Sequence, residues 1–221
     1  FMSTVVLEEN VRIPNRVVDL KTFRVWARSA SFPQKGRIAF LDGEVWIDMS
    51  PEELFTHNQV KGVFAVVLGG LVVSSRLGRY FHDRTLVSNP EADLSNEPDG
   101  TLVTYDSFRS RRVRMVRGKQ GVMELEGSPD IVLEVVSPSS VKKETVVLRE
   151  LYWKAGVREY WLVDPRSLEI RRFVLQDGRF DTGRLFEMAD TSSPRFSRGS
   201  PSRSPRSSRS GEADTLVPQR S

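Results

Sequence analysis

The stretch Asp130-Ile-Val-Leu-Glu-Val-Val136 is the most apolar strand-like run in the sequence. Its apolar residues hardly alternate with polar ones, which is typical of a central strand that is covered on both faces. A helical pattern follows from Lys143 to Ala155 and ends at Gly156, and Val157–Val163 then has the pattern of a second buried strand. The order of strand, helix and strand predicts the centre of a mixed sheet that is flanked by helices.

Further elements are predicted on the N-terminal side of this centre. Residues 17–30 have the spacing of a short amphipathic helix. Asp42-Gly43 joins two strand-like runs and predicts a hairpin, because a type I′ turn needs positive φ at both central positions. Ser50-Pro51-Glu52-Glu53 predicts the start of a long helix to about Leu77, with Ser50 as the N-cap. The expected buried stripe of this helix consists of Val60, Val63, Phe64, Val67, Leu68 and Leu71.

Shorter strands are predicted around these elements, together with a closing hairpin at Asp177-Gly178. The strand-like runs are residues 79–87, 101–104, 113–116 and 122–125. The whole order favours one α/β domain over residues 17–190, preceded by an irregular arm at residues 1–16.

Residues 191–221 are rich in Ser, Arg and Pro and have few apolar side chains. They cannot bury enough surface to offset the entropy of ordering, so a disordered tail is expected. The tail holds six arginines and two acidic residues, so its net charge of +4 equals that of the whole chain. The folded part is therefore neutral, and the basic balance of the chain is no evidence that this part binds nucleic acid. The tail could bind phosphate groups of a nucleic acid through its arginines, or it could be an extension without a function.

The composition excludes several kinds of site. The chain has no cysteine, which excludes disulfides, thiolate metal sites and a cysteine nucleophile. His57 and His82 are the two histidines, so a metal site would need carboxylates. The longest apolar stretch, Val63–Val73, has about half the length of a membrane span. No segment has the pattern of a signal peptide, so a soluble cytoplasmic protein without membrane contact is expected.

Glu134 lies in the middle of the most apolar strand, where a charge is costly unless it is paired or bound to a cation. Asp130 shares its strand and face but lies roughly 13 Å away, so Asp130 is more plausible as a strand-entry residue. Asp99 precedes the strand-like run Thr101–Thr104, which can neighbour the central strand at about 4.8 Å. Asp99 and Glu134 can therefore share an ion.

Pro98-Asp99, Glu134 within an apolar strand and a nearby lysine together resemble the pattern of the PD-(D/E)XK nucleases. The resemblance implies that the two acids hold Mg²⁺, that a backbone carbonyl beside the second acid adds a ligand, and that the lysine orients or deprotonates the attacking water. Magnesium needs only one or two protein carboxylates, because it keeps waters and takes phosphate oxygens from the substrate. Mn²⁺ can take its place. The position two residues after Glu134, where the lysine is expected, holds Val136.

Two longer stretches carry a more specific resemblance. They are Gly127-Ser-Pro-Asp-Ile-Val-Leu-Glu-Val-Val-Ser-Pro-Ser-Ser140 and Leu151-Tyr-Trp-Lys-Ala-Gly-Val-Arg-Glu-Tyr-Trp-Leu-Val-Asp-Pro165. With the segment around Asp42-Gly43 and Met49-Ser-Pro51, they closely resemble the Uma2 family of bacterial restriction-endonuclease-like proteins over about residues 35–175. The resemblance implies a restriction-endonuclease-like mixed β-sheet flanked by helices, with hairpin additions. It also implies an endonuclease that hydrolyses the phosphodiester bonds of DNA.

Carried over onto this sequence, Asp99 matches the first metal-binding acid of the family and Glu134 the second. Many family members place a lysine on the following helix near the position of Leu148. Lys143 is the preferred candidate for a migrated lysine, with Lys142 and Arg149 as the alternatives. An arginine would keep the positive charge but could not act as a base, because its pKa is too high.

Two further residues match family positions. His57 recurs near the start of the long helix, so it is expected at the rim of the site as an added ligand or phosphate contact. The alternative is a helix histidine with a satisfied hydrogen bond. Glu44 matches an acid of the family hairpin and could contact the lysine, or it could be a surface acid of the strand.

Basic residues cluster between Arg109 and Lys119. The candidate phosphate contacts in this cluster are Arg111, Arg112 and Arg114. The alternative interpretation is a solvated basic hairpin that faces Glu124 and Glu126.

Three functional hypotheses follow from these residues. The first is a Mg²⁺-dependent DNA endonuclease, and the second is a catalytically inactive relative that binds nucleic acid or protein through the same fold. The third is a structural or dimerisation module that uses the exposed hairpins. A homodimer is an open alternative, because nucleases that cut both strands often pair two sites by two-fold symmetry.

Overall fold

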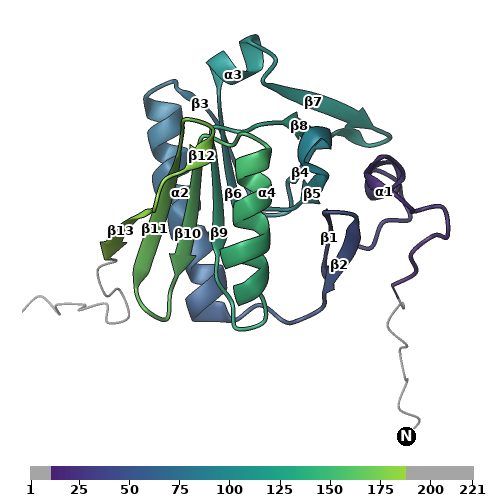
Figure 1. Ribbon diagram of the computed structural model, residues 1–221, viewed down its shortest axis with the longest axis horizontal. Helices are drawn as coiled ribbons and strands as arrows, with labels where there is room; N and C mark the ends of the chain where they lie inside the picture. The colour runs from purple at the N-terminus through teal and green to yellow at the C-terminus, as the bar shows by residue number, and fades with distance from the viewer. Residues whose placement is uncertain (1–10, 188–221) are drawn as a thin grey trace, which may run out of the picture. The chain divides into compact units, whose positions relative to one another are not determined.

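The computed structural model describes residues 11–187, which form two mixed sheets flanked by helices (Figure 1). Residues 11–19 contain no helix or strand, as expected for the irregular arm. The predicted tail at residues 191–221 lies outside the described residues, as does the domain boundary at residue 190. The predicted α/β class with helix-flanked mixed sheets is confirmed, but two sheets share the strands that were expected in one.

The larger sheet has the strand order β12-β11-β10-β9-β6-β3, and β13 also pairs with β11. Its centre is β9 (Ile131–Val135), which pairs parallel with β10 (Glu159–Asp164) and antiparallel with β6 (Gly100–Thr104). The outer strands are β3 (Gly78–His82), β11 (Glu169–Gln176), β12 (Arg179–Phe180) and β13 (Arg184–Glu187). The central strand and the closing hairpin were therefore predicted correctly.

The second sheet has the order β2-β1-β5-β4-β8-β7. Asp42 and Gly43 both have positive φ, of 49° and 83°, and join β1 (Arg37–Leu41) to β2 (Glu44–Asp48) as predicted. The other strands are β4 (Leu86–Asn89), β5 (Leu94–Asn96), β7 (Val113–Gly118) and β8 (Gly121–Gly127). The short helices are α1 (Leu20–Ala27), η2 (Pro90–Ala92) and α3 (Tyr105–Arg109).

Helices cover both faces of β9, which explains why its sequence hardly alternates. On one face, Val132 packs with Leu148 of η3 (Lys143–Leu148) and with α4 (Arg149–Lys154). On the other face, Leu133 and Val135 pack against α2 (Gln59–Ser74). Figure 1 shows α2 and α4 on opposite sides of this sheet. Glu134 follows the alternation of the strand and points to the same side as Val132, toward α4.

The long helix begins later than predicted. A π-helical turn, η1 (Leu54–Asn58), leads into α2, and Glu53 caps it by accepting hydrogen bonds from two backbone N–H groups of the first turn. The predicted N-cap, Ser50, instead donates to Asp48 from both its backbone N–H and its hydroxyl. Ser50 therefore belongs to the turn after β2 and caps no helix.

The predicted buried stripe of α2 is partly wrong. Leu68 is buried on the sheet, and Val60 and Phe64 pack beside it. The wrongly placed side chains, each more than half exposed, are Val63, Val67 and Leu71. The inner face of the helix instead includes Lys61, whose ammonium lies near Asp99.

Candidate active site

The two predicted acids lie on neighbouring strands. The antiparallel register of β6 and β9 pairs Gly100 with Leu133, so Asp99 lies opposite Glu134 at the end of this ladder. Both residues are 2% exposed. Asp99 Oδ2 accepts a hydrogen bond of 2.8 Å from the backbone N–H of Val135, which fixes the Asp99 carboxylate beside β9.

The position of Asp99 depends on close packing around it. Its backbone carbonyl accepts a hydrogen bond from the N–H of Asp83, which ties the segment before β6 to the end of β3. At Gly100, a Cβ atom would lie 2.2 Å from the hydroxyl of Tyr80. Glycine therefore lets Tyr80 pack directly against the backbone next to Asp99. Burial, and then the charge of Asp99, raise the pKa of Tyr80 to about 12.

Glu134 has one bonded oxygen and one free oxygen. Its Oε1 accepts hydrogen bonds from Asn96 Nδ2 at 2.9 Å and from the hydroxyl of Tyr152 at 2.7 Å. Its Oε2 makes no hydrogen bond within residues 11–187. Burial, and then the neighbouring charge of Asp99, raise the pKa of Glu134 to about 7. The pair of carboxylates therefore carries an unfavourable interaction that a cation would relieve.

Glu134 lies on the wall of a cleft with a volume of about 310 Å³. The polar residues that line this cleft include Asp48, Glu52, His57, Glu134, Lys143 and Glu144. They come from β2, from the turn before α2, from β9 and from η3. The cleft thus opens where the hairpin of the second sheet, the start of the long helix and the end of the central strand meet.

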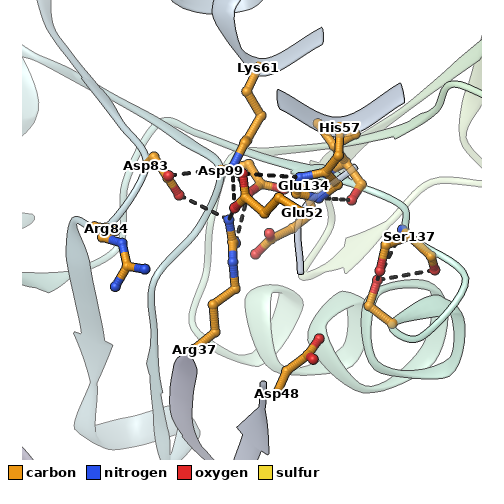
Figure 2. Close-up of polar contacts among 12 residues, drawn as sticks. Arg37, Asp48, Glu52, His57, Lys61, Asp83, Arg84, Asp99, Glu134 and Ser137 are labelled. Atoms are coloured by element: carbon orange, nitrogen blue, oxygen red, sulfur yellow. Dashed lines mark hydrogen bonds and ion pairs between the residues drawn. The ribbon is translucent and has the colours of Figure 1, made fainter. Parts of the chain in front are cut away.

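Asp99 lies in contact with two cationic side chains that the sequence did not indicate. Arg37 of β1 donates from Nη1 to Asp99 Oδ1 at 2.8 Å, and Lys61 Nζ lies 3.7 Å from the same oxygen. Figure 2 shows both side chains converging on Asp99 together with Glu52 and Asp83. Arg37 Nη2 bonds to Glu52 at 2.5 Å and to Asp83 at 3.1 Å. Lys61 Nζ bonds to the same two acids, at 2.6 and 3.3 Å.

This cluster keeps Glu52 ionised. Burial alone would raise the pKa of Glu52, but the hydrogen bonds from Lys61 and Arg37 outweigh it and lower the pKa to about 2. Burial alone would lower the pKa of Arg37. The neighbouring acids Asp99, Asp83 and Glu52 outweigh this effect and raise the pKa. Two cations therefore face three carboxylates beside the cleft, and a negative charge remains that a metal ion could balance.

His57 lies inside the site and not at its rim. Its Nε2 is 3.0 Å from the carbonyl oxygen of Val135 and 3.6 Å from Asp99 Oδ2, and the residue is buried. Its Nδ1 is buried without a hydrogen-bond partner among the described residues and lies 3.9 Å from Glu52. The hydrogen bond to Val135 agrees with the alternative of a satisfied helix histidine. A role as metal ligand or phosphate contact stays a prediction.

The three candidates for the lysine role lie in different places, and only one of them lines this cleft. Lys143 lines the cleft, and its charge favours the ionised form of Glu134. Lys142 is exposed and is not part of the cleft lining. Arg149 lies over the ring of Phe173, 5.6 Å from its centroid, and lines a different cleft of about 240 Å³. Leu148 is fully buried in the core with Tyr152, so the family position of the lysine is part of the apolar packing.

Glu144 is a further acid of the cleft that the sequence did not reveal. It is buried, and its Oε2 has no hydrogen-bond partner within the described part of the chain. Burial, and then the charge of Glu134, raise the pKa of Glu144. A buried acid in a helix that also exposes Lys142 has no distinctive sequence signal, because only the fold shows which side of η3 faces the cleft.

Glu44 is not brought to the site. It is exposed at the start of β2, opposite Leu41, and does not line the cleft. Asp48, at the other end of the same strand, lines the cleft and feels the charge of Lys143. The acid of β2 that lies near the lysine is therefore Asp48.

The basic cluster is largely engaged within the fold. Arg114 pairs with Glu126, and Arg112 donates to the carbonyl oxygen of Gly156. Glu126 also pairs with Arg24 of α1. These contacts agree with the alternative of a basic hairpin that faces its own acids. Arg111 is exposed, and phosphate binding by these arginines stays a prediction.

Asp99 and Glu134 are the residues that could hold a metal ion. Within residues 11–187, no group of three or more His, Asp and Glu side chains is arranged as a metal site. A two-carboxylate site still suits Mg²⁺, which completes its octahedron with waters and substrate oxygens. The free Oε2 of Glu134 and the repulsion between the two acids fit such an ion. Asp99 Oδ1 retains lone-pair capacity beside its bond to Arg37.

No helix within residues 11–187 is long and apolar enough to cross a membrane. A search of curated proteins found no match. Among solved structures, the chain is similar to one described as a "putative nuclease belonging to DUF820" from Anabaena variabilis. The TM-score is 0.58 at 18% sequence identity, and the similarity covers 77% of this chain and 84% of the other. The similarity shows a shared fold. The family model of Uma2, described as "Putative restriction endonuclease", matches residues 20–199, and the chain therefore belongs to the Uma2 family.

Proposed function

We propose that this protein is a Mg²⁺-dependent DNA endonuclease that hydrolyses phosphodiester bonds in the cytoplasm. The observation that carries the proposal is the position of two buried carboxylates, Asp99 and Glu134, on neighbouring strands, with Glu134 on the wall of an open cleft and its Oε2 free to bind a cation. Membership in a family described as restriction endonucleases supports the reaction class.

A bound Mg²⁺ would lower the pKa of a water molecule and neutralise charge on the phosphate in the transition state. The chain supplies the positioning. Tyr152 and Asn96 hold Oε1 of Glu134, which leaves Oε2 directed at the cleft. Arg37 and the N–H of Val135 hold the two oxygens of Asp99. The acids are thus fixed before any ion binds, which reduces the cost of organising the site.

Lys143 is assigned the lysine role of the nuclease pattern. Lys143 lines the cleft from η3. In this position it can orient the attacking water or a non-bridging phosphate oxygen. His57 lies next to the Val135 carbonyl, the oxygen that would be the backbone ligand in the nuclease pattern, and can adjust its position.

The test is a supercoiled-plasmid nicking assay with Mg²⁺, with Mn²⁺ and with EDTA. Wild type should nick only with a divalent ion, and Glu134→Ala should reduce nicking at least about 100-fold. Glu150→Gln is the matched control, because this acid is exposed on α4 and, among the described residues, its ion pair is with Lys154. Equal nicking by wild type and Glu134→Ala would end the proposal.

A second candidate function is a non-catalytic nucleic-acid-binding relative. The specific observation that favours it is Leu148, an apolar core residue near the position where the resemblance places the lysine of many family members. Such a protein would bind a DNA duplex with and without divalent ions and would leave the plasmid intact. A fluorescence-anisotropy titration run beside the nicking assay separates the two functions.

A further inference from the structure

The outer face of α2 is apolar and uncovered by any described element. Val66 and Val73 are each 76% exposed, and three further side chains on this face, Val63, Val67 and Leu71, are more than half exposed. At 100° per residue, these positions and Gly70 fall on one side of the helix, opposite the buried Leu68 and Val72. A helix on the surface of a soluble domain normally presents polar residues here.

This face also lacks charge. Lys61 is the one charged residue between Gln59 and Ser74, and it is buried on the inner side, where it bonds to Glu52. Nothing on the outer face would repel an identical face, and no charge would have to be desolvated to cover it. Charge therefore does not oppose the pairing of this face with a second copy of itself.

Glycines flank the centre of this face. Gly62 and Gly70 lie four residues before and after Val66, and a Cβ atom at either would meet nothing within 4 Å. Packing within the described chain therefore does not require glycine at these positions. Each glycine costs about 1 kcal/mol relative to alanine in a helix interior. Their use is explained if another surface approaches the helix closely at these two points.

We propose that the outer face of α2 binds the same face of a second copy of this chain, in a two-fold symmetric, antiparallel helix pair. The spacing Gly62, Val66, Gly70 is the same in both directions along the helix. An antiparallel two-fold axis near Val66 therefore brings each Gly62 near the partner's Gly70, and the two valines meet at the centre. A two-fold interface needs such a self-complementary patch.

The size of the patch agrees with the centre of a stable interface. The 16 residues of α2 make a strip about 24 Å long. Leu54 and Phe55, 69% and 72% exposed, extend the apolar surface at the start of the helix. Stable interfaces bury about 800 Å² per partner, with an apolar centre and a polar rim. Soluble monomers rarely leave a contiguous apolar patch of more than a few hundred Å² uncovered.

The proposed dimer does not depend on the nuclease function, but a dimer would support cleavage of both DNA strands. The inner side of the same helical segment carries Lys61 and His57, which face Asp99. Pairing through the outer side would relate two clefts by a two-fold axis, with Lys61 and His57 on the inner side of each helix. A particle with two sites related in this way suits cutting both strands of a duplex.

The chain has no cysteine, so a single substitution gives a unique probe of this contact. Val66→Cys lies at the proposed axis and should form a disulfide-linked dimer on mild oxidation, since two thiols near a two-fold axis can meet the required Cα separation of about 4.4–6.8 Å. Val122→Cys is the control, because Val122 is 52% exposed on β8, in the other sheet. It should remain monomeric on a non-reducing gel.

The oligomeric state of the cysteine-free protein is the second measurement. Sedimentation equilibrium of wild type should give twice the monomer mass at micromolar concentration. Val66→Glu should raise the dissociation constant at least about 100-fold, because two like charges would be buried together. Its far-ultraviolet circular dichroism should match wild type, since the side chain is exposed in the monomer.

Three outcomes would overturn the proposal: a monomeric wild type at 50 µM or above, equal cross-linking of Val66→Cys and Val122→Cys, or an unchanged dimer in folded Val66→Glu. The first would mean that a partner of different sequence, or a segment outside residues 11–187, covers the face. None of these outcomes affects the nicking assay, so the two proposals fail separately.

Discussion

Asp99 Oδ2 accepts a hydrogen bond from the backbone N–H of Val135, the residue that directly follows Glu134. This bond places one carboxylate of the candidate site on the backbone that carries the other. The two acids therefore cannot move apart to relieve their repulsion without breaking a buried hydrogen bond. Their repulsion must be relieved by protonation or by a bound cation.

Glu134→Gln should stabilise the metal-free protein more at pH 8 than at pH 5. The pKa of Glu134 is raised to about 7 in the folded state, against about 4.3 when unfolded. Between these values the folded protein binds more protons than the unfolded chain, so this carboxyl lowers stability as the pH rises through the window. Glutamine removes this loss. The gain at pH 8 should exceed the gain at pH 5 by on the order of 2 kcal/mol, measured by urea denaturation in EDTA.

The pH dependence of that gain is the informative quantity, since Glu134 also accepts hydrogen bonds from Asn96 and Tyr152 that glutamine can only partly replace. The same gain at both pH values would mean that the carboxyl is not the source of the effect. Glu150→Gln, on the exposed side of α4, should show no gain at either pH.

Divalent metal should stabilise the folded protein through the same two acids. With Mg²⁺ or Mn²⁺ at ten times its dissociation constant, binding adds about 1.4 kcal/mol to the free energy of unfolding. For a chain of this size the melting temperature should rise by about 3–6 °C. Asp99→Asn and Glu134→Gln should each lose this shift. A shift that survives in both variants would place the metal elsewhere on the chain.

Lys61 and Glu52 should be energetically coupled. Lys61→Met keeps the length of the side chain but removes the ammonium that bonds to Glu52 beside Arg37, so the free energy of unfolding should fall by about 2 kcal/mol. Glu52→Gln should be destabilising as well. The double variant should lose at least about 1 kcal/mol less than the two single losses together, because the second substitution removes a partner already lost. Strict additivity, in a double-mutant cycle by urea denaturation, would contradict the contact.

The sequence predicted those parts of the site that depend on local chemistry. Asp42-Gly43 fixed a hairpin because few residues tolerate its backbone conformation. The apolar run around Glu134 identified a central strand because its side chains pack into the core on both faces of the sheet. A charge in such a strand needs a partner nearby, and this requirement led to Asp99.

The Arg37–Lys61 cluster could not be predicted in the same way. Arg37, Lys61 and Asp83 come from a strand, a helix and a turn that are far apart in the sequence and meet only through the fold. The face of α2 turned toward the sheet was missed for a related reason. Valines occur all around this helix, so its apolar pattern does not distinguish the side packed on the sheet from the side that is exposed.

Lys143 and Lys142 offer an adjacent pair for testing the lysine role, because only Lys143 lines the cleft. Lys143→Ala should reduce plasmid nicking about 100-fold, while Lys142→Ala should stay within twofold of wild type. Lys143→Arg then separates two roles, since arginine keeps the positive charge but cannot release a proton at neutral pH. Substantial activity in Lys143→Arg would assign Lys143 to positioning and charge stabilisation. Activity as low as in Lys143→Ala would favour proton transfer or a strict geometric requirement. Full activity in Lys143→Ala would remove the residue from the mechanism, because no other lysine lines this cleft among the described residues.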